Sequence, residues 1–128
     1  MKKVDICIYQ GEDFVYNFDA LLDSNLDPID ISAYTAKMQM RRTPRAKIIE
    51  LEIDETNNVT LGTDGVISIS IPCGVNRHFD WTGGRFDIRL TDTSGDVSFP
   101  YYGAVLIQPA VTLNDPDFNN DFNCDFGP

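Results

Sequence analysis

The feature that most constrains this chain is a two-residue alternation of apolar and polar side chains, which recurs in short runs along most of the sequence. In the segment 34–42 the apolar members stand at every second position: Tyr34, Ala36, Met38 and Met40. Successive side chains of a β-strand point to opposite faces, so the pattern predicts a strand with one buried face and one solvated face. Helical periodicity is almost absent, and an all-β fold is therefore expected.

Similar runs occur in segments separated by turns rich in Gly, Asp and Asn. They occupy residues 4–8, 14–18, 49–53, 59–61, 66–71, 84–99 and 101–113. About eight short strands with such turns are typical of an antiparallel sandwich or a partly closed barrel. The first two runs, joined by QGED, are expected to form a hairpin.

Prolines, glycines and one short helical pattern refine this prediction. Pro100 and Pro109 are expected at strand ends or edges, because proline cannot donate a hydrogen bond to a neighbouring strand. A single helical turn is expected within residues 75–81, with Trp81 buried. A chain of 128 residues has the size of one domain, which we place at residues 1–113.

The charge of the chain disfavours several classes of partner. Acids outnumber bases 20 to 10, and the formal net charge is −10. Nucleic acids and anionic membranes attract basic proteins, so neither is an expected partner. No segment approaches the roughly 20 apolar residues of a membrane span. No signal peptide is expected at the start, because Asp5 interrupts its apolar run.

Residues suited to catalysis or to metal binding do not gather in a recognisable motif. His78 is the only histidine, and no nucleophile motif or Cys-x-x-Cys pair accompanies it. Residues 115–121 open like a calcium-binding EF-hand loop, but Asn120 and Phe126 occupy the positions of its glycine and its glutamate. We therefore expect no enzyme, no cofactor and no metal site, and calcium at the acidic end of the chain stays an open alternative.

The last fifteen residues, 114–128, form a separate acidic segment with phenylalanines at four-residue intervals. Its aromatic residues and the aspartates before them are Phe118, Phe122, Phe126, Asp117, Asp121 and Asp125. Asp and Asn are poor helix formers, so an extended arm is expected. We hypothesise that the phenylalanines anchor on a neighbouring subunit while the aspartates meet basic groups there. Folding back on the same domain and a mobile arm are the alternatives.

A cluster of cations stands out in this acidic chain. The sequence RRTPRAK places four of them at Arg41, Arg42, Arg45 and Lys47. One interpretation is a solvated hairpin loop. The other is that these residues receive the acidic arm of an adjacent copy, which would favour a homo-oligomer or a closed ring.

Three stretches carry a resemblance to a known group of proteins. They read QGEDFVYNFDALLDSNLDPIDISAYTAKMQMR, VISISIPCGVN and WTGGRFDIRLTDTSGDVSFPYYGAVLIQPAVT. Together they resemble a module of tailed-bacteriophage virions, similar to the N-terminal domain of upper-baseplate proteins and of tail-fibre adaptors. The chain departs from that pattern at Asn25-Leu26, where Asn-Gly is usual.

The resemblance implies an immunoglobulin-like β-sandwich that serves as a structural subunit of a virion, in the tail, the baseplate or the fibre attachment. Its partners would be other phage structural proteins, and it would be assembled in the cytoplasm of a host bacterium. Two alternatives stay open. One is a capsid-decorating or head-fibre protein. The other is a carbohydrate-binding module in which exposed Trp81, Tyr101 and Tyr102 stack on sugar rings.

Overall fold

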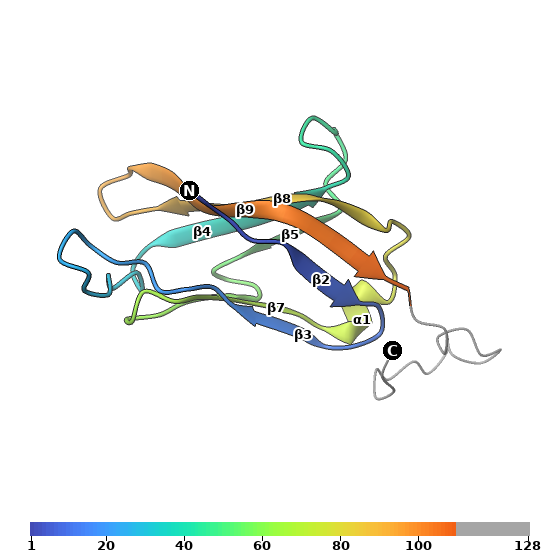
Figure 1. Cartoon of the computed structure of the whole chain (residues 1–128), viewed down its shortest axis with the longest axis horizontal. Helices are drawn as coiled ribbons and strands as arrows, with labels where there is room; N and C mark the ends of the chain where they lie inside the picture. Colours follow the sequence, from blue (N-terminus) through green and yellow to red (C-terminus); the bar gives the residue numbers. More distant parts are fainter. Residues whose placement is uncertain (110–128) are drawn as a thin grey trace.

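A computed structural model of the chain describes residues 1–109. The strands are β1 (Lys2–Lys3), β2 (Ile6–Tyr9), β3 (Phe14–Asn17), β4 (Thr35–Arg41), β5 (Leu51–Asp54), β6 (Val59–Leu61), β7 (Ile67–Ile71), β8 (Gly83–Thr91) and β9 (Val97–Gln108), and the helix is α1 (Cys73–Asn76). The larger sheet has the order β1-β9-β8-β4-β5, with β2 also paired to β9, and the smaller sheet has the order β3-β7-β6. The two sheets lie one above the other (Figure 1). The all-β prediction is confirmed.

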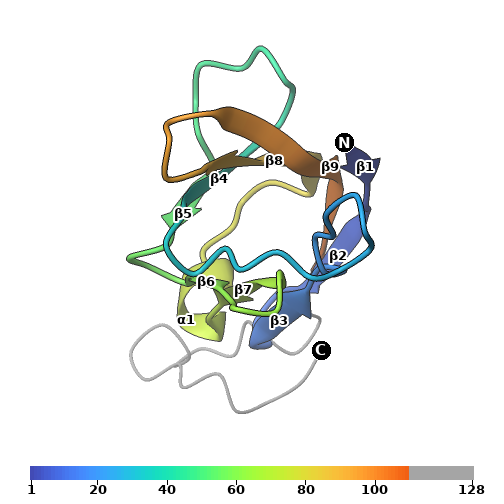
Figure 2. The same cartoon turned by 90° about the vertical axis from the view of Figure 1, so that its left-hand side faces the viewer.

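Figure 2 shows the two sheets end on as two layers, and the core consists of the buried side chains between them. Alternate residues of β4 and β7 are buried as the sequence pattern predicts: Ala36, Met38 and Met40 from β4, and Ile67, Ile69 and Ile71 from β7. Phe18 belongs to this core, and the centroid of its ring lies 4.7 Å from that of Tyr101 and 6.2 Å from that of Phe86. Each isoleucine buried in this way contributes about 1.5–3 kcal/mol.

The predicted hairpin between the first two runs is wrong. β2 pairs in parallel with β9, Ile8 opposite Ile107. β3 pairs antiparallel with β7 in the other sheet, Tyr16 opposite Ile69. The QGED segment therefore crosses from one sheet to the other, and the larger sheet is mixed rather than purely antiparallel.

The strand next to β9 is interrupted between β1 and β2, where the backbone of β9 comes very close. A Cβ atom added to Gly103 would lie 1.8 Å from the carbonyl oxygen of Val4. Glycine is required at this approach because any side chain would displace the first strand. The Asp5 carboxylate accepts a hydrogen bond from the backbone N–H of Ala104 at 3.0 Å. This bond replaces a backbone pairing that the interruption removes.

Pro100 does not end a strand, because β9 runs past it to Gln108. It does lie at an edge, the other predicted position, because β9 pairs there with β8 alone and its pairing with β1 begins at Tyr101. Leu90 of β8 pairs with Ser98, whereas Ile88 pairs with Tyr101, so β9 carries one extra residue between these pairs. A bulge leaves one residue out of the ladder, which is where a missing N–H is tolerated. Pro109 does follow the end of β9, as predicted.

Helix α1 is one turn that begins two residues before the predicted segment and closes one end of the core. Trp81 follows it and is 4% exposed, which confirms its predicted burial. Its ring lies 5.1 Å from that of Phe79. Within residues 1–109, no helix is long and apolar enough to cross a membrane.

The side chain of Asn76, at the end of α1, is fully buried and joins the helix to the QGED crossing. Its Oδ1 accepts the Gly11 N–H, and its Nδ2 donates to the Glu12 carbonyl, each at 2.7 Å. Gln10 adds two bonds, to the carbonyl oxygens of Arg77 at 3.0 Å and of Phe79 at 2.9 Å. These bonds hold the crossing segment in place and explain why it does not fold as a hairpin turn.

Candidate functional site

The predicted arm lies outside the described residues. Its six predicted contact residues are Phe118, Phe122, Phe126, Asp117, Asp121 and Asp125. The boundary placed after residue 113 lies there too. The role of the arm and the position of the boundary therefore stay predictions. The candidate surfaces of the described structure lie within residues 1–109.

The cation cluster lies at the connection between β4 and β5, which pair as an antiparallel hairpin. We call residues 42–50 the basic loop. Arg41, the last residue of β4, donates to the Ala46 carbonyl and, at 3.0 Å, to Gln39 Oε1. Arg42 forms ion pairs with Glu50 and Asp80, both at 3.2 Å. Half of the predicted cluster is thus engaged within the chain itself.

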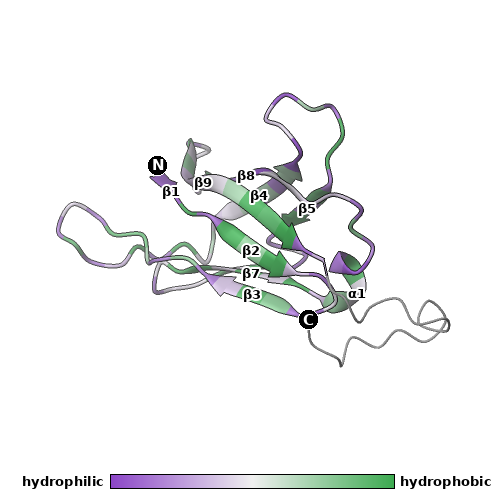
Figure 3. Cartoon of the chain, turned by 45° about the vertical axis from the view of Figure 1, so that its right-hand side comes forward, coloured by the Kyte–Doolittle hydropathy of each residue, from purple (hydrophilic) through white to green (hydrophobic). Residues whose placement is uncertain are grey.

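The other half of the cluster is available. Arg45 and Lys47 are exposed, and neither forms an ion pair with any residue in the described part of the chain. Ile48 beside them is 71% exposed. The basic loop therefore presents two unpaired cations and one bare aliphatic side chain. Figure 3 shows hydrophilic and hydrophobic residues mixed along it.

The outer face of the larger sheet carries four more cations, among which the carboxylates of Glu52, Asp54 and Asp87 also lie. Lys37 of β4 lies opposite Arg89 of β8, and Arg41 lies opposite Arg85. Like charges directly opposite each other on a sheet are destabilising. These four cations and the three of the basic loop make seven of the ten in the chain. The sequence analysis missed Arg85 and Arg89, although their alternation with Phe86 and Ile88 placed them on the solvated face.

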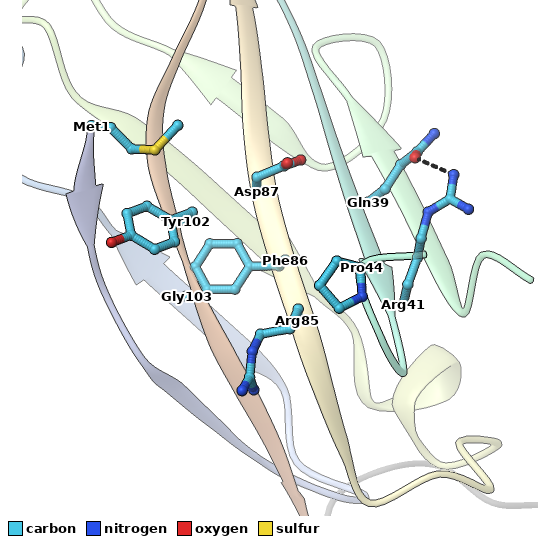
Figure 4. A pocket seen from close by; sticks show the side chains of 9 residues that line it. All are labelled: Met1, Gln39, Arg41, Pro44, Arg85, Phe86, Asp87, Tyr102 and Gly103. Atoms are coloured by element: carbon cyan, nitrogen blue, oxygen red, sulfur yellow. Dashed lines mark hydrogen bonds between the residues drawn. The ribbon is translucent and has the colours of Figure 1, made fainter. Parts of the chain in front are cut away.

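The same face carries a hollow, which we call the outer-face hollow (Figure 4). Its volume is about 460 Å³, and its lining is Met1, Gln39, Arg41, Pro44, Arg85, Phe86, Asp87, Tyr102 and Gly103. Partial burial raises the pKa of Asp87, while Arg41 and Arg89 act to lower it. The hollow joins the apolar side chains of Met1, Pro44 and Tyr102 to charges of both signs, those of Arg41, Arg85 and Asp87, and such a mixed lining suits a partner side chain that is aromatic or polar.

The opposite end of the molecule is acidic. We call this surface, formed by residues 19–30, 62–65 and 92–99, the acidic end; Figure 1 shows it at the left, away from the basic loop at the upper right. Its carboxylates are Asp19, Asp23, Asp27, Asp30, Asp64, Asp92 and Asp96. Lys2 pairs with Asp19 at 2.5 Å. Sequence analysis did not single out this end, because its acids come from three separate turns.

An apolar groove of about 520 Å³, the end groove, adjoins the acidic end. Leu21, Leu22, Ile29 and Phe99 are among its lining residues. Leu22 is 47% exposed and Phe99 37% exposed. Exposed apolar side chains beside a hollow are typical of a surface that binds another protein.

The aromatic residues expected to bind a sugar do not form an exposed set. Trp81 and Tyr101 are buried in the core at 4% and 3% exposure, and only Tyr102 is accessible, at 39%. His78 is exposed and accepts a hydrogen bond from Arg77 at 3.2 Å. Within residues 1–109, no three His, Cys, Asp or Glu side chains gather in a way that could hold a metal ion.

No protein-family model matches the chain, and no curated protein is detectably similar to it in sequence. What the molecule offers for a functional argument is therefore its own surfaces: a basic loop and outer face, and an acidic end with an apolar groove.

Proposed function

We propose that this protein is a non-enzymatic structural subunit of a tailed-bacteriophage virion, in the tail, the baseplate or the fibre attachment. It acts by binding copies of itself and other virion proteins. The observation that carries the proposal is the presence of two unlike surfaces, the basic loop and the acidic end, at opposite ends of the two-sheet body (Figure 1). The basic loop and the outer face of the larger sheet together carry seven of the ten cations of a chain whose net charge is −10, and seven aspartates lie at the acidic end. Complementary charge of this kind steers association and fixes the orientation of partners.

The like-charge pairs on the outer face support a role for that surface. Repulsion between Lys37 and Arg89, and between Arg41 and Arg85, is offset only in part within the chain, where Glu52 pairs with Lys37 at 3.7 Å and Asp87 lies near Arg41 and Arg89. A partner that brings carboxylates to this face relieves the repulsion.

The order of the strands favours an immunoglobulin-like sandwich, the fold that the sequence resemblance implies. Lettered from B to G along the chain, β3-β7-β6 correspond to B-E-D of an immunoglobulin domain. β9-β8-β4-β5 then correspond to G-F-C-C′. Such domains serve widely as building blocks, and function resides in their surfaces.

The acidic arm has a suitable acceptor in the outer-face hollow. We infer that the outer-face hollow, with Tyr102, Arg41 and Arg85 in its lining, is a candidate acceptor for the Asp-Phe pairs of the arm. The arm of a neighbouring copy and the arm of the same copy both match this chemistry. Concentration dependence separates them, because only the first produces oligomers.

Two other roles remain as alternatives. A capsid-decorating or head-fibre protein uses the same sandwich and the same complementary surfaces. A carbohydrate-binding module is the weaker alternative, since Tyr102 alone of its expected aromatic platform is accessible.

Fractionated phage particles test the proposal. Tails and heads are separated, and peptides of this chain are sought by mass spectrometry in each fraction. Peptides in the tail fraction support the proposal, peptides in the head fraction support the decorating role, and absence from both rejects a virion role. For the arm, sedimentation velocity of the full chain is compared with that of a chain lacking residues 115–128. An unchanged oligomer distribution excludes an assembly role for the arm.

A further inference from the structure

Leu26 occupies a position where its side chain is costly in two ways. Its φ is +66°, in the left-handed region that residues with a Cβ atom rarely adopt. Its side chain is 76% exposed. A strained backbone that presents a bare leucine to solvent stabilises neither the turn nor the core. Such an outlier points to a contact that forms elsewhere.

A second turn of the chain has the same hydrogen-bond pattern and can be compared with this one. In residues 92–96, Asp92 accepts the N–H groups of Ser94 and Asp96 on Oδ1, and its backbone bonds close the turn. Residues 23–27 repeat each of these bonds around Asp23. Where the second turn has Gly95 with φ +94°, the first has Leu26. The turn itself therefore needs no leucine, and glycine would serve it better.

Leu26 lies at the acidic end, in the same loop as Leu22 and Ile29, which line the end groove. Leu22 pairs with Pro28 across this loop. Asp27 and Asp96 are exposed and form no ion pair within residues 1–109. The acidic end thus offers an apolar patch with unpaired carboxylates around it. Its partner should carry an exposed aliphatic side chain next to unpaired cations.

The basic loop has this chemistry. Ile48 is 71% exposed and Ile49 39% exposed, and Arg45 and Lys47 precede them without an ion pair in the described part of the chain. We propose that the basic loop of one copy docks on the acidic end of the next. Ile48 enters the end groove against Leu26, and Arg45 and Lys47 meet Asp27 and Asp96. This inference rests on the proposed function, because it assigns the surfaces through which the chain self-assembles.

The positions of the two surfaces determine the kind of assembly. β4 begins at the acidic end and finishes at the basic loop, so the surfaces lie at opposite ends of the sheet (Figure 1). A contact between unlike surfaces of identical subunits is head to tail. It produces a ring where the rotation between subunits closes and a filament where it does not.

Leu26→Gly separates assembly from folding, since the replacement suits the turn. We expect this variant to unfold at a temperature equal to or above that of the unmodified chain. Its self-association measured by sedimentation velocity should be weaker by roughly tenfold or more, as for the loss of one buried aliphatic side chain. Ile48→Ser should weaken association to a similar degree. Val15→Ser is the matched control, because Val15 is 65% exposed on β3, away from both surfaces.

Charge reversal tests the pairing directly. One variant carries Asp27→Lys and Asp96→Lys, and the other carries Arg45→Glu and Lys47→Glu. Each alone should be monomeric at low ionic strength, since like charges then face each other, and an equimolar mixture should associate. Failure of the mixture to associate, with both variants folded by circular dichroism, overturns the docking proposed here.

Other outcomes separate this inference from the proposed function. If the unmodified chain self-associates and neither Leu26→Gly nor Ile48→Ser weakens it, the docking is wrong and the structural role stands. If removal of residues 115–128 alone abolishes association, the arm carries the contact instead. If the chain is monomeric at every concentration and ionic strength, the inference fails, and the fractionated particles still decide the virion role.

Discussion

Replacement of Asn76 by alanine should destabilise the fold far more than its position in a single-turn helix suggests. The change removes two hydrogen bonds of 2.7 Å and leaves the Gly11 N–H and the Glu12 carbonyl without these partners. Gly11 is buried, whereas Glu12 is exposed, so that water can replace the bond to its carbonyl. A buried polar group left unpaired costs about 1–3 kcal/mol, and this is the cost expected here. A domain of this size has about 5–15 kcal/mol of stability in total.

The measurement is urea unfolding followed by tryptophan fluorescence. Trp81 is the only tryptophan, is buried, and lies next to Phe79, whose carbonyl accepts a bond from Gln10 of the same network. With a slope of about 1–3 kcal/mol per molar urea, the midpoint should fall by roughly 1 M. Asn57→Ala, at an exposed position, is the control and should change the stability by less than about 0.5 kcal/mol.

Asn76→Asp adds a second test of the same reasoning. The carboxylate still accepts the Gly11 N–H, but it faces the Glu12 carbonyl with no proton to donate. The variant should be unstable at neutral pH and should recover part of its stability where the carboxyl becomes protonated. A free energy of unfolding for Asn76→Ala within about 0.5 kcal/mol of the unmodified chain would refute the argument.

Three further predictions follow from single contacts. Gly103→Ala should lower the melting temperature, because the added Cβ overlaps the backbone at Val4 at a cost of about 1–3 kcal/mol or more. Gly74→Ala is the control and should not lower it, because a Cβ atom at Gly74 has no neighbouring atom within 4 Å. Tyr101→Phe removes the bond from its hydroxyl to the Asp19 carbonyl and should cost about 0.5–1.5 kcal/mol in denaturant unfolding. The pKa of Asp92 is lowered, chiefly by the Ser94 hydroxyl. The ionised Asp92 carboxylate therefore stabilises the fold at pH values above its unfolded pKa near 3.8. This stabilisation is lost as the pH falls through the lower pKa of the folded state. Asp92→Asn should flatten the decline of the melting temperature below about pH 4, and an equally steep decline would contradict this.

The sequence was sufficient to predict which residues form strands, because alternation is a local property of the chain. Met38 and Met40 are buried, and Ile69 is buried, at the positions that the pattern assigns. The partners of strands are not local. Ile8 pairs with Ile107, about a hundred residues away, and nothing near either residue indicates the other. The failed hairpin has the same origin, since Asn76 fixes the QGED crossing from a distant part of the chain.

In the candidate site, too, local features were predictable from the sequence and contacts between distant segments were not. Arg45 and Lys47 were predicted as exposed cations of a hairpin loop, and the structure confirms both the loop and their exposure. Arg42 forms ion pairs with Glu50 and Asp80 that the sequence did not indicate, and its contact with a partner stays a prediction. The acidic end escaped prediction, because three turns that are far apart in sequence meet there only after folding. Leu26 was noted in the sequence as standing where glycine is usual. The structure adds that its backbone is in the left-handed region and that its side chain is exposed.

The parallel contact between β2 and β9 has a consequence for how the protein is made. β2 pairs with β9, the last strand of the described chain. The residues of β2 therefore leave the ribosome well before β9 has been synthesised. Pairing across so long a loop is slow, since the entropy of closing the loop is lost before the contact stabilises it. Until then Ile6 and Ile8 remain exposed to other growing chains. Synthesis that pauses before residue 97 should therefore favour aggregation, whereas a pause after β9 is complete should not.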